Sequence, residues 1–423
     1  MRDGAPVSGM YVYFQNADST VVLATTTDAN GTASAVMDAG GYVTAIDTAP
    51  PLLLGGASSN QLLTYADVKP GDQLRYGRSL ESTGIGVTIN AVLDPAASSM
   101  YVYSPCLPDG AQLAGLAATA IAQPVTTTTT LYGCGATTDF LLVSYDQNNQ
   151  PLNTAFVPNV PVADQGTVDL TAAVLAGADT KTWTFNNGPA LTSLSVEDDL
   201  LDAQGRTFST YMETPSDAQN PTLTMPVPAF TGAGQLVQTF VATGNSHTLL
   251  DWGPYASTFT TDVGARLLAE LTAPPSFDPA THALSITEGA TGATADFALS
   301  AVSASRAADG HTWIWEIIAP HATTITLPTL PTDVYDFNIT ASDSVQVEGW
   351  ATGKVPGGYD AVRPFLFSTQ GPSDLAKVSG SGAASVELYQ APPMARTGRI
   401  LWGSAASQAT SETLLTHFQR RRR

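Results

Sequence analysis

Hydrophobic and polar residues alternate along most of the chain. Residues 7–15 read VSGMYVYFQ and residues 19–27 read STVVLATTT, and both stretches are rich in β-branched and aromatic side chains. Because successive side chains of a strand point to opposite faces, this period of two predicts half-buried β-strands, separated by turn residues about every 8 to 12 positions. The pattern predicts an all-β protein of consecutive Ig-like or transthyretin-like β-sandwiches with few short helices.

Helical periodicity is confined to three short stretches. They are DLTAAVLAGA at residues 169–178, DVGARLLAEL at 262–271 and SETLLTHFQ at 411–419. In the last of these, the hydroxyl of Ser411 is suited to capping a helix N-terminus. We expect short helices at these places and strands through most of the remaining chain.

The stretch TTTDANGTASAVM at residues 25–37 brings Asp, Asn and Gly close together and raises the question of a calcium loop. An EF-hand loop needs Gly at its sixth position and Glu at its twelfth. Counting from Asp28, Gly31 comes fourth and Ala39 comes twelfth, so the pattern fails. Asp28 suits the first position of a type I turn and Gly31 the left-handed residue that closes it, so we expect a turn.

The first 47 residues carry motifs of a known module. Residues 4–9 have the form G-x-P-V-x-G, residues 26–31 the form T-x-D-x-x-G, and the aromatic strand GYVTAI follows at 41–46. This combination resembles the carboxypeptidase regulatory-like and bacterial Ig-like modules, which are small transthyretin-type β-sandwiches. LTYADVKPGDQLRYG at 63–77 is similar to the closing strands of such a module. The resemblance implies an extracellular, non-catalytic part of a secreted or lipid-anchored bacterial surface protein, and it transfers no functional residue.

Turn-rich stretches suggest how the chain divides. We expect an N-terminal sandwich over residues 1–83, a second over 84–182, and a β-rich region over 183–395. The stretch TAPPSFDPATHA at 272–283 resembles a linker, so the third region is expected as either one domain or two. Residues 396–423 are expected to form a partly helical or disordered tail that is a candidate for reaching another subunit.

The charge excludes some partners. The net charge is −20, from 17 basic and 37 acidic side chains, and this negative field repels nucleic acid and anionic lipid. Charged residues make up only 13%, which is typical of extracellular β-rich proteins with hydroxyl-rich surfaces. No apolar run reaches the roughly 18 residues of a membrane helix. Residues 1–9 show no export signal, and we expect that an export or anchoring segment is missing from this sequence.

The two cysteines, Cys106 and Cys134, each lie beside a β-type segment and form no CxxC metal or redox motif. A disulfide between them would close a loop and stabilise the fold by about 3 to 4 kcal/mol. The alternative is two buried free thiols, since cysteine is commonly buried without bonding. We expect the disulfide.

Four acidic residues form the strongest candidate for a metal site. Glu197, Asp198, Asp199 and Asp202 lie within SVEDDLLDAQGRTF, and several carboxylates on a flexible loop are what Ca²⁺ prefers. Their spacing matches no known calcium loop, and acidic neighbours often just solvate a turn. Calcium is therefore a weak candidate here, and no other cofactor is expected.

Histidine-containing stretches give little support for catalysis. Ser246, His247 and Asp251 are close in sequence, but Ser246 and His247 would point to opposite faces of a strand. The five histidines have no ligand spacing; they are His247, His282, His311, His321 and His417. A serine hydrolase therefore remains only a second alternative, and the chain is expected not to be an enzyme.

The strand HTWIWEIIAP at residues 311–320 sets Trp313 and Trp315 on one face. If exposed, these rings would stack on sugars. A strand that is apolar on both faces is more simply a central core strand. We therefore predict a structural, adhesive or assembly role at a cell surface, with contacts to other surface proteins or to itself through sheet edges. Polysaccharide binding through exposed aromatics is the alternative.

Overall fold

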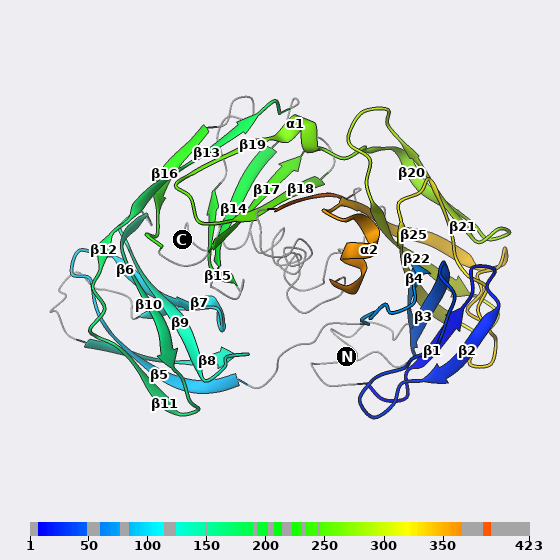
Figure 1. Cartoon of the computed structure of the whole chain (residues 1–423), viewed down its shortest axis with the longest axis horizontal. Helices are drawn as coiled ribbons and strands as arrows, with labels where there is room; N and C mark the ends of the chain where they lie inside the picture. Colours follow the sequence, from blue (N-terminus) through cyan, green and yellow to red (C-terminus); the bar gives the residue numbers. More distant parts are fainter. Residues whose placement is uncertain are drawn as a thin grey trace.

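The computed structural model describes residues 7–48, 60–76, 84–113, 124–148, 150–188, 193–201, 207–213, 222–230, 234–242, 246–365 and 384–390. Within these residues the chain is mostly β-strand, with two short α-helices. The all-β prediction is confirmed. Figure 1 shows the strands following a curved path, with β5 to β12 at one end and β1 to β4 at the other.

A single twelve-stranded sheet runs through much of this path. In spatial order its strands are β15 (Thr207–Glu213), β14 (Ser193–Leu201), β17 (Gly234–Ala242), β18 (Ser246–Gly253), β26 (Ala384–Gln390), β25 (Ser344–Lys354), β22 (Phe297–Arg306), β23 (His311–Pro320), β4 (Asn60–Val68), β3 (Gly41–Asp47), β1 (Tyr11–Gln15) and β2 (Val21–Thr26).

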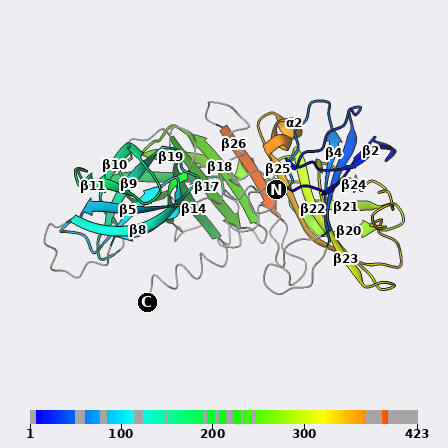
Figure 2. The same cartoon turned by 90° about the horizontal axis from the view of Figure 1, so that it is seen from below.

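Strand β26 joins the two halves of this sheet. It pairs antiparallel with β18 on one side, where His247 faces Tyr389, and antiparallel with β25 on the other, where Thr352 faces Tyr389. Figure 2 shows β26 lying between β18 and β25. A strand from late in the chain thus completes the hydrogen-bond ladder between two sandwiches.

The N-terminal strands share their sheet with strands much later in the chain. Strand β4 pairs in parallel with β23, with Leu62 opposite Trp315 and Thr64 opposite Ile317. This differs from the separate sandwich that we expected over residues 1–83. The reason is that both edges of β4 carry free backbone groups, and β23 pairs with the edge that β3 leaves open.

The sandwich that includes this shared sheet is called the fourth sandwich, after a second sandwich at residues 84–177 and a third at residues 179–262. The second sheet of the fourth sandwich consists of β20 (Leu271–Asp278), β21 (Ala283–Glu288) and β24 (Thr324–Thr326). Buried side chains from both sheets form one core, including Trp313, Trp315 and Trp350. Helix α2 (Gly358–Val362) packs with Tyr65 and Ile318 on the opposite face of the large sheet.

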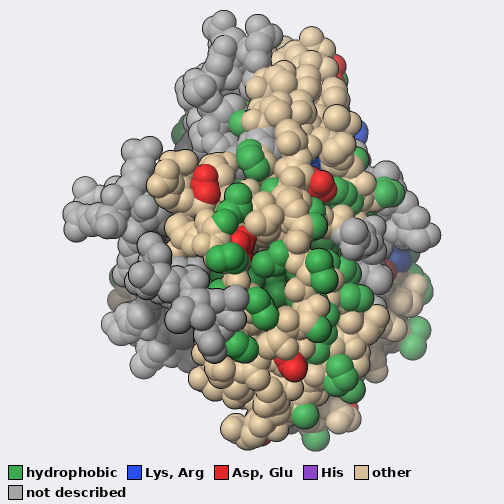
Figure 3. Space-filling view, turned by 90° about the vertical axis from the view of Figure 1, so that its left-hand side faces the viewer, with side chains coloured by type: hydrophobic (Ala, Val, Ile, Leu, Met, Phe, Trp, Pro, Cys, Tyr) green, Lys and Arg blue, Asp and Glu red, His purple; other side chains and the backbone are tan. Residues whose placement is uncertain are grey.

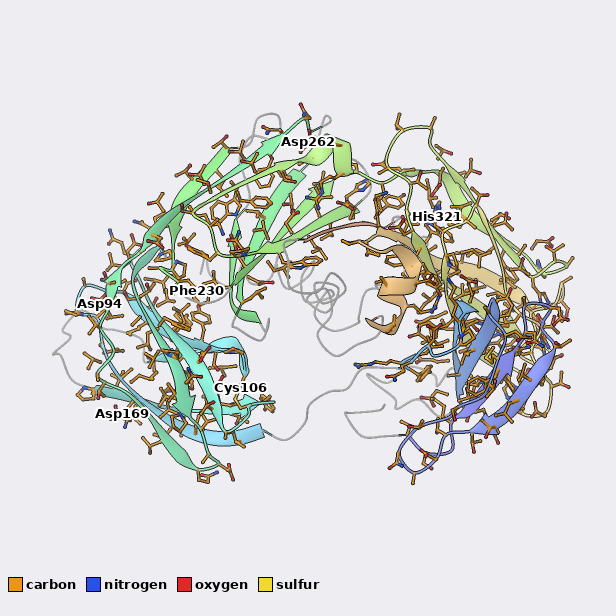
Figure 4. All side chains as sticks on the ribbon, viewed as in Figure 1. Asp94, Cys106, Asp169, Phe230, Asp262 and His321 are labelled. Carbon is orange, nitrogen blue, oxygen red and sulfur yellow. A yellow bond between two sulfur atoms is a disulfide. The ribbon has the colours of Figure 1, made fainter. Side chains whose placement is uncertain are left out.

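The second sandwich has a core of its own. One sheet contains β11 (Gly166–Leu170), β5 (Gly84–Val92) and β8 (Pro124–Tyr132). The other contains β12 (Ala176–Gly177), β10 (Pro151–Pro161), β9 (Thr137–Tyr145), β6 (Ser99–Ser104) and β7 (Leu107–Leu113). The predicted disulfide between Cys106 and Cys134 is confirmed, with the two Cα atoms 5.4 Å apart. Figure 4 places Cys106 within this sandwich.

The third sandwich packs β13 (Asp179–Asn186), β16 (Thr222–Val227) and β19 (Thr258–Asp262) against β14, β17 and β18. Trp183, Val196 and Leu249 lie in its core. A smaller cluster, in which Leu141 and Val143 of β9 meet Leu200 of β14 and Phe230, joins it to the second sandwich. Phe230 lies between these two units in Figure 4.

The predicted helices and linker require correction. In 169–178, the helix prediction was wrong: Asp169 and Leu170 end β11, and Ala176–Gly177 forms β12. In 262–271, helix α1 spans only Val263–Arg266, with Asp262 capping it by accepting from the Ala265 amide at 3.1 Å. Most of the supposed linker is β20, whose prolines fall at a break in register between Ala273 and Ser276, where a missing N–H is tolerated. The predictions for 411–419 and 396–423 lie outside the described residues.

The predicted turn at Asp28 is confirmed. The Asp28 carboxylate accepts hydrogen bonds from the amides of Asn30 and Thr32, at 2.8 and 2.9 Å. Gly31 has φ +68°, the left-handed conformation that glycine adopts without a steric penalty. The Asp28 carboxylate is therefore engaged by the turn itself.

Candidate functional site

Strand β2 is an exposed edge of the large sheet. It pairs with β1 on one side, with Val12 opposite Thr25 and Phe14 opposite Leu23. On its other side no strand lies within the described part of the chain. Its outward backbone N–H and C=O groups can therefore pair with another strand.

The side chains of β2 are unusually apolar for such an edge. Val21, Val22 and Leu23 are 47%, 39% and 38% exposed. Phe14 pairs with Leu23 and Gln15 with Val21, so a β-bulge at Val22 places Val21 and Leu23 on opposite faces, and both faces of the edge are apolar. No charged residue occurs from Ser19 to Thr27. Natural sheet edges are commonly protected by charges, prolines or short strands, and this edge has neither a charge nor a proline.

The turn before β2 is fixed to the fourth sandwich. The buried side-chain amide of Gln15 donates to the carbonyl oxygens of Ser19 and Thr329, at 3.0 and 2.7 Å. The Thr329 amide donates in turn to the Ser19 hydroxyl at 3.3 Å. These bonds hold the β1–β2 hairpin at its tip, so the edge is presented in one orientation.

A second feature is a group of half-buried tyrosines on β6 and β9. The rings of Tyr101 and Tyr103 stack with centroids 6.1 Å apart, and Tyr145 meets Tyr101 edge-on at 5.7 Å. The hydroxyls of Tyr103 and Tyr145 are 3.0 Å apart. All three side chains are half-buried, so each keeps some surface in contact with solvent.

The surface around the second sandwich carries few charges. Figure 3 shows mostly uncharged polar and hydrophobic atoms at this end of the molecule, with single acidic side chains scattered between them. A shallow hollow of about 270 Å³ lies over β5 and β8, lined by Gly86, Val87, Thr88, Thr128, Thr129, Thr130 and Gln165. No side chain in this lining is ionisable, so the hollow holds no acid or base.

Three of the acidic residues proposed for calcium, Glu197, Asp198 and Asp199, lie on a strand rather than a loop. Asp198 and Asp199 are adjacent positions of β14 and are both buried, and they point to opposite faces. Asp198 pairs with Lys181, and Glu197 belongs to the same strand. Asp202 lies outside the described residues. No group of three or more His, Cys, Asp or Glu within the described ranges is arranged to hold a metal ion.

The residues considered for a triad do not converge. Ser246 is exposed and His247 is buried, as expected for opposite faces of β18. His247 Nε2 bonds the Glu270 carboxylate at 2.9 Å, and burial lowers the pKa of His247 although Glu270 opposes the shift. The Asp251 carboxylate accepts from Arg266 Nη1 at 2.7 Å. The side chains of His247 and Asp251 thus serve the junction around β26 and not a nucleophile.

The remaining histidines are also separate. His321 pairs with Glu288 at 2.8 Å in the fourth sandwich, where Figure 4 places it. His311 stacks on Tyr335 at 4.2 Å, and His282 lies at a turn with φ +53°. His417 lies outside the described residues.

The tryptophans considered for sugar binding are buried. Trp313 and Trp315 have no exposed surface, because the β20–β21–β24 sheet covers their face. A ring without solvent contact cannot stack on a sugar, so the ligand role is wrong and the core interpretation is confirmed.

Sequence reasoning missed Lys181. It is 1% exposed, on the inward face of β13 that also carries Trp183 and Phe185. The signal was present, since a lone lysine two positions before an inward-facing tryptophan must also point inward on a strand.

Comparison with known proteins gives no family. No protein-family model matches the chain, and no curated protein matches it. Among solved structures, the chain has a weak similarity to the Bacteroides ovatus mixed-linkage glucan utilization locus SGBP-B in complex with a mixed-linkage heptasaccharide. The two share 11% identity over 92% of this chain and 93% of the other, with a TM-score of 0.11. This likeness is too weak to carry any argument about fold or ligand.

Among the described residues, no helix is long and apolar enough to span a membrane.

Proposed function

We propose that the protein is a non-enzymatic structural component of a cell surface that associates with a second copy of itself through strand β2. The observation that carries this proposal is the exposed, uncharged edge formed by Val21, Val22 and Leu23. An extracellular location fits the disulfide, because disulfides persist in oxidising compartments. The N-terminal resemblance to surface-protein modules agrees with the same role.

A second copy is the partner that this edge fits best. Two identical strands pair antiparallel about a two-fold axis, so each copy supplies the same surface to the other. The apolar side chains of β2, Val21, Val22 and Leu23, then lie beside those of the second copy. Copies that each carry a net charge of −20 repel one another, and an uncharged edge is where that repulsion is smallest.

Replacing Val22 by Lys is expected to weaken this association. In a symmetric pair the substitution places two ammonium groups near each other, and like charges across strands are destabilising. A loss of about 1 kcal/mol corresponds to a dissociation constant raised about fivefold. Sedimentation velocity over a range of concentrations measures the dissociation constant.

The matched control is Val174→Lys, which makes the same chemical change at a side chain that is 84% exposed and lies far from β2, between β11 and β12. This variant is expected to associate like the unchanged protein. Equal dissociation constants for both variants, or a wild-type chain that is monomeric at every concentration, would rule out pairing through β2.

Polysaccharide binding is the second candidate, favoured by the half-buried cluster of Tyr101, Tyr103 and Tyr145. Aromatic stacking contributes about 0.5 to 1.5 kcal/mol, so Tyr101→Ala should weaken binding by several-fold. Electrophoresis through gels containing soluble polysaccharides measures this as lost retardation. Tyr132→Ala is the control, since Tyr132 is 49% exposed on the other sheet. No retardation of the wild-type chain in any gel would exclude this second function.

A further inference from the structure

A lysine and an aspartate meet inside the third sandwich. Lys181 lies on β13 and Asp198 on β14, which belong to opposite sheets of that sandwich. Their side chains are 1% and 3% exposed, and Lys181 Nζ is in direct contact with Asp198 Oδ2. The pair therefore crosses the core from one sheet to the other, shielded from water.

Neighbouring groups hold each partner in place. The Trp183 indole Nε1 donates to Asp198 Oδ2 at 3.1 Å. Lys181 Nζ donates to the side-chain oxygen of Gln235, which also accepts from the Ala256 amide at 3.2 Å. The rings of Trp183 and Tyr255 lie 5.4 and 5.1 Å from Lys181 Nζ. The amine and the carboxyl group are thus confined to one geometry.

One polar atom of the pair has no hydrogen-bond partner within the described part of the chain. Asp198 Oδ1 is buried and accepts no hydrogen bond from the described residues. An unsatisfied buried carboxylate oxygen is costly, because its hydration is lost and nothing replaces it. If the two groups form only an ion pair, the free-energy cost of burying Oδ1 remains.

Burial also favours the uncharged forms of both groups. It lowers the pKa of Lys181 and raises the pKa of Asp198, and their mutual attraction opposes both shifts. Transfer of one proton from the ammonium to the carboxylate converts the ion pair into a neutral amine beside a neutral carboxylic acid, with no exchange with solvent. A neutral amine is a nucleophile, and an ammonium is not.

We propose that Lys181 and Asp198 condense to an amide, giving an isopeptide cross-link between strands β13 and β14. This inference goes beyond the proposed function and does not depend on pairing through β2.

The reaction balances without a cofactor. The Lys181 nitrogen attacks the Asp198 carboxyl carbon and forms the new C–N bond. Negative charge develops on Oδ2, where the Trp183 N–H already donates and stabilises it. Oδ1 takes the proton that the ammonium gave to the carboxylate and one further proton from the nitrogen, the C–O bond to Oδ1 breaks, and one water leaves.

The product satisfies the groups that the ion pair leaves unsatisfied. The amide N–H donates to the Gln235 side-chain oxygen, and the amide carbonyl, formerly Oδ2, accepts from Trp183. Oδ1, the unpartnered atom, has departed as water. The site therefore matches the hydrogen-bonding needs of an amide better than those of a carboxylate.

Mass spectrometry of the folded, purified full-length chain, denatured and reduced before measurement, tests the proposal. The expected mass is lower than that of the reduced sequence by one water molecule. Trypsin does not cleave after an acylated lysine, so residues 79–206 are expected as one peptide instead of 79–181 and 182–206. Within that peptide, no backbone fragment is released between Lys181 and Asp198, because the amide closes a ring.

Two variants make the assignment specific. Lys181→Arg keeps the positive charge but cannot form this amide, so it is expected to have the full mass. Lys69→Arg alters an exposed lysine that also contacts an aspartate, Asp360, and is expected to keep the loss of water. A full mass for the wild-type chain, or cleavage after Lys181 despite a lost water, would overturn the cross-link; the second outcome would point to a succinimide instead.

Discussion

Replacing Lys181 by Met is expected to destabilise the third sandwich by about 3 to 5 kcal/mol. This is the range found when one member of a buried ion pair is removed and the other stays behind. Asp198 would keep its bond from Trp183 but lose its countercharge in a site that is about 3% exposed. Guanidinium unfolding followed by tryptophan fluorescence, to which the core residue Trp183 contributes, measures the loss.

The double variant Lys181→Met with Asp198→Leu is the control for this experiment. Replacing both members of a buried pair by apolar side chains is often neutral or stabilising, so an ion pair predicts recovery of most of the lost stability. An amide predicts that about 3 kcal/mol remains lost, because a cross-link between these positions restricts the unfolded chain. A single variant as stable as the wild-type chain would contradict both descriptions of the pair.

Replacing Trp315 by Ala is expected to destabilise the fourth sandwich by about 3 to 5 kcal/mol, the range for large-to-small changes in a core. Trp315 has no exposed surface, and its indole N–H donates to the Thr64 hydroxyl at 2.8 Å. Thr64 lies on β4 and Trp315 on β23, so the substitution also weakens the parallel pair that holds the N-terminal strands. Thermal unfolding measures the stability, and amide hydrogen exchange in β1 to β4 measures the loss of docking.

Tyr132→Ala serves as the comparison, since it removes a large aromatic ring that is 49% exposed. Surface substitutions of this kind usually change stability by less than about 0.5 kcal/mol. Unchanged exchange in β1 to β4 of the Trp315 variant would show that these strands do not depend on the β4–β23 pair.

Alternation predicted the strands but not their neighbours. The pattern in HTWIWEIIAP placed β23 at its observed bounds, His311–Pro320, because each inward side chain recurs at every second position. Its pairing with β4 brings together residues about 250 positions apart, as in Thr64 and Trp315. Nothing local encodes that contact, since it depends on which sheet edges remain open after the hairpins form. Tertiary packing also decides which side chains of residues 169–178 are buried: Leu170 is buried by the facing sheet, whereas Val174 is 84% exposed. The local sequence therefore suggested a helix that this stretch does not form.

The buried pair was within reach of sequence reasoning. Leu194, Val196, Asp198 and Leu200 follow one another at every second position, so Asp198 belongs to the inward face of a strand. The prediction of an acidic loop grouped Glu197, Asp198 and Asp199 together and did not consider the direction of each side chain. It therefore missed that Asp198 points inward. The partner Lys181 shows the same alternation, but the contact between β13 and β14 is set by tertiary packing.

The position of β26 has a consequence for the order of folding. The strands on either side of it, β18 and β25, lie about a hundred residues apart in the chain, and β26 follows both. During synthesis the third and fourth sandwiches can each collapse early around local hairpins, but the ladder between them closes only after residues 384–390 leave the ribosome. Until then the edges of β18 and β25 that face each other lack their partner strand, and β26 then pairs with both.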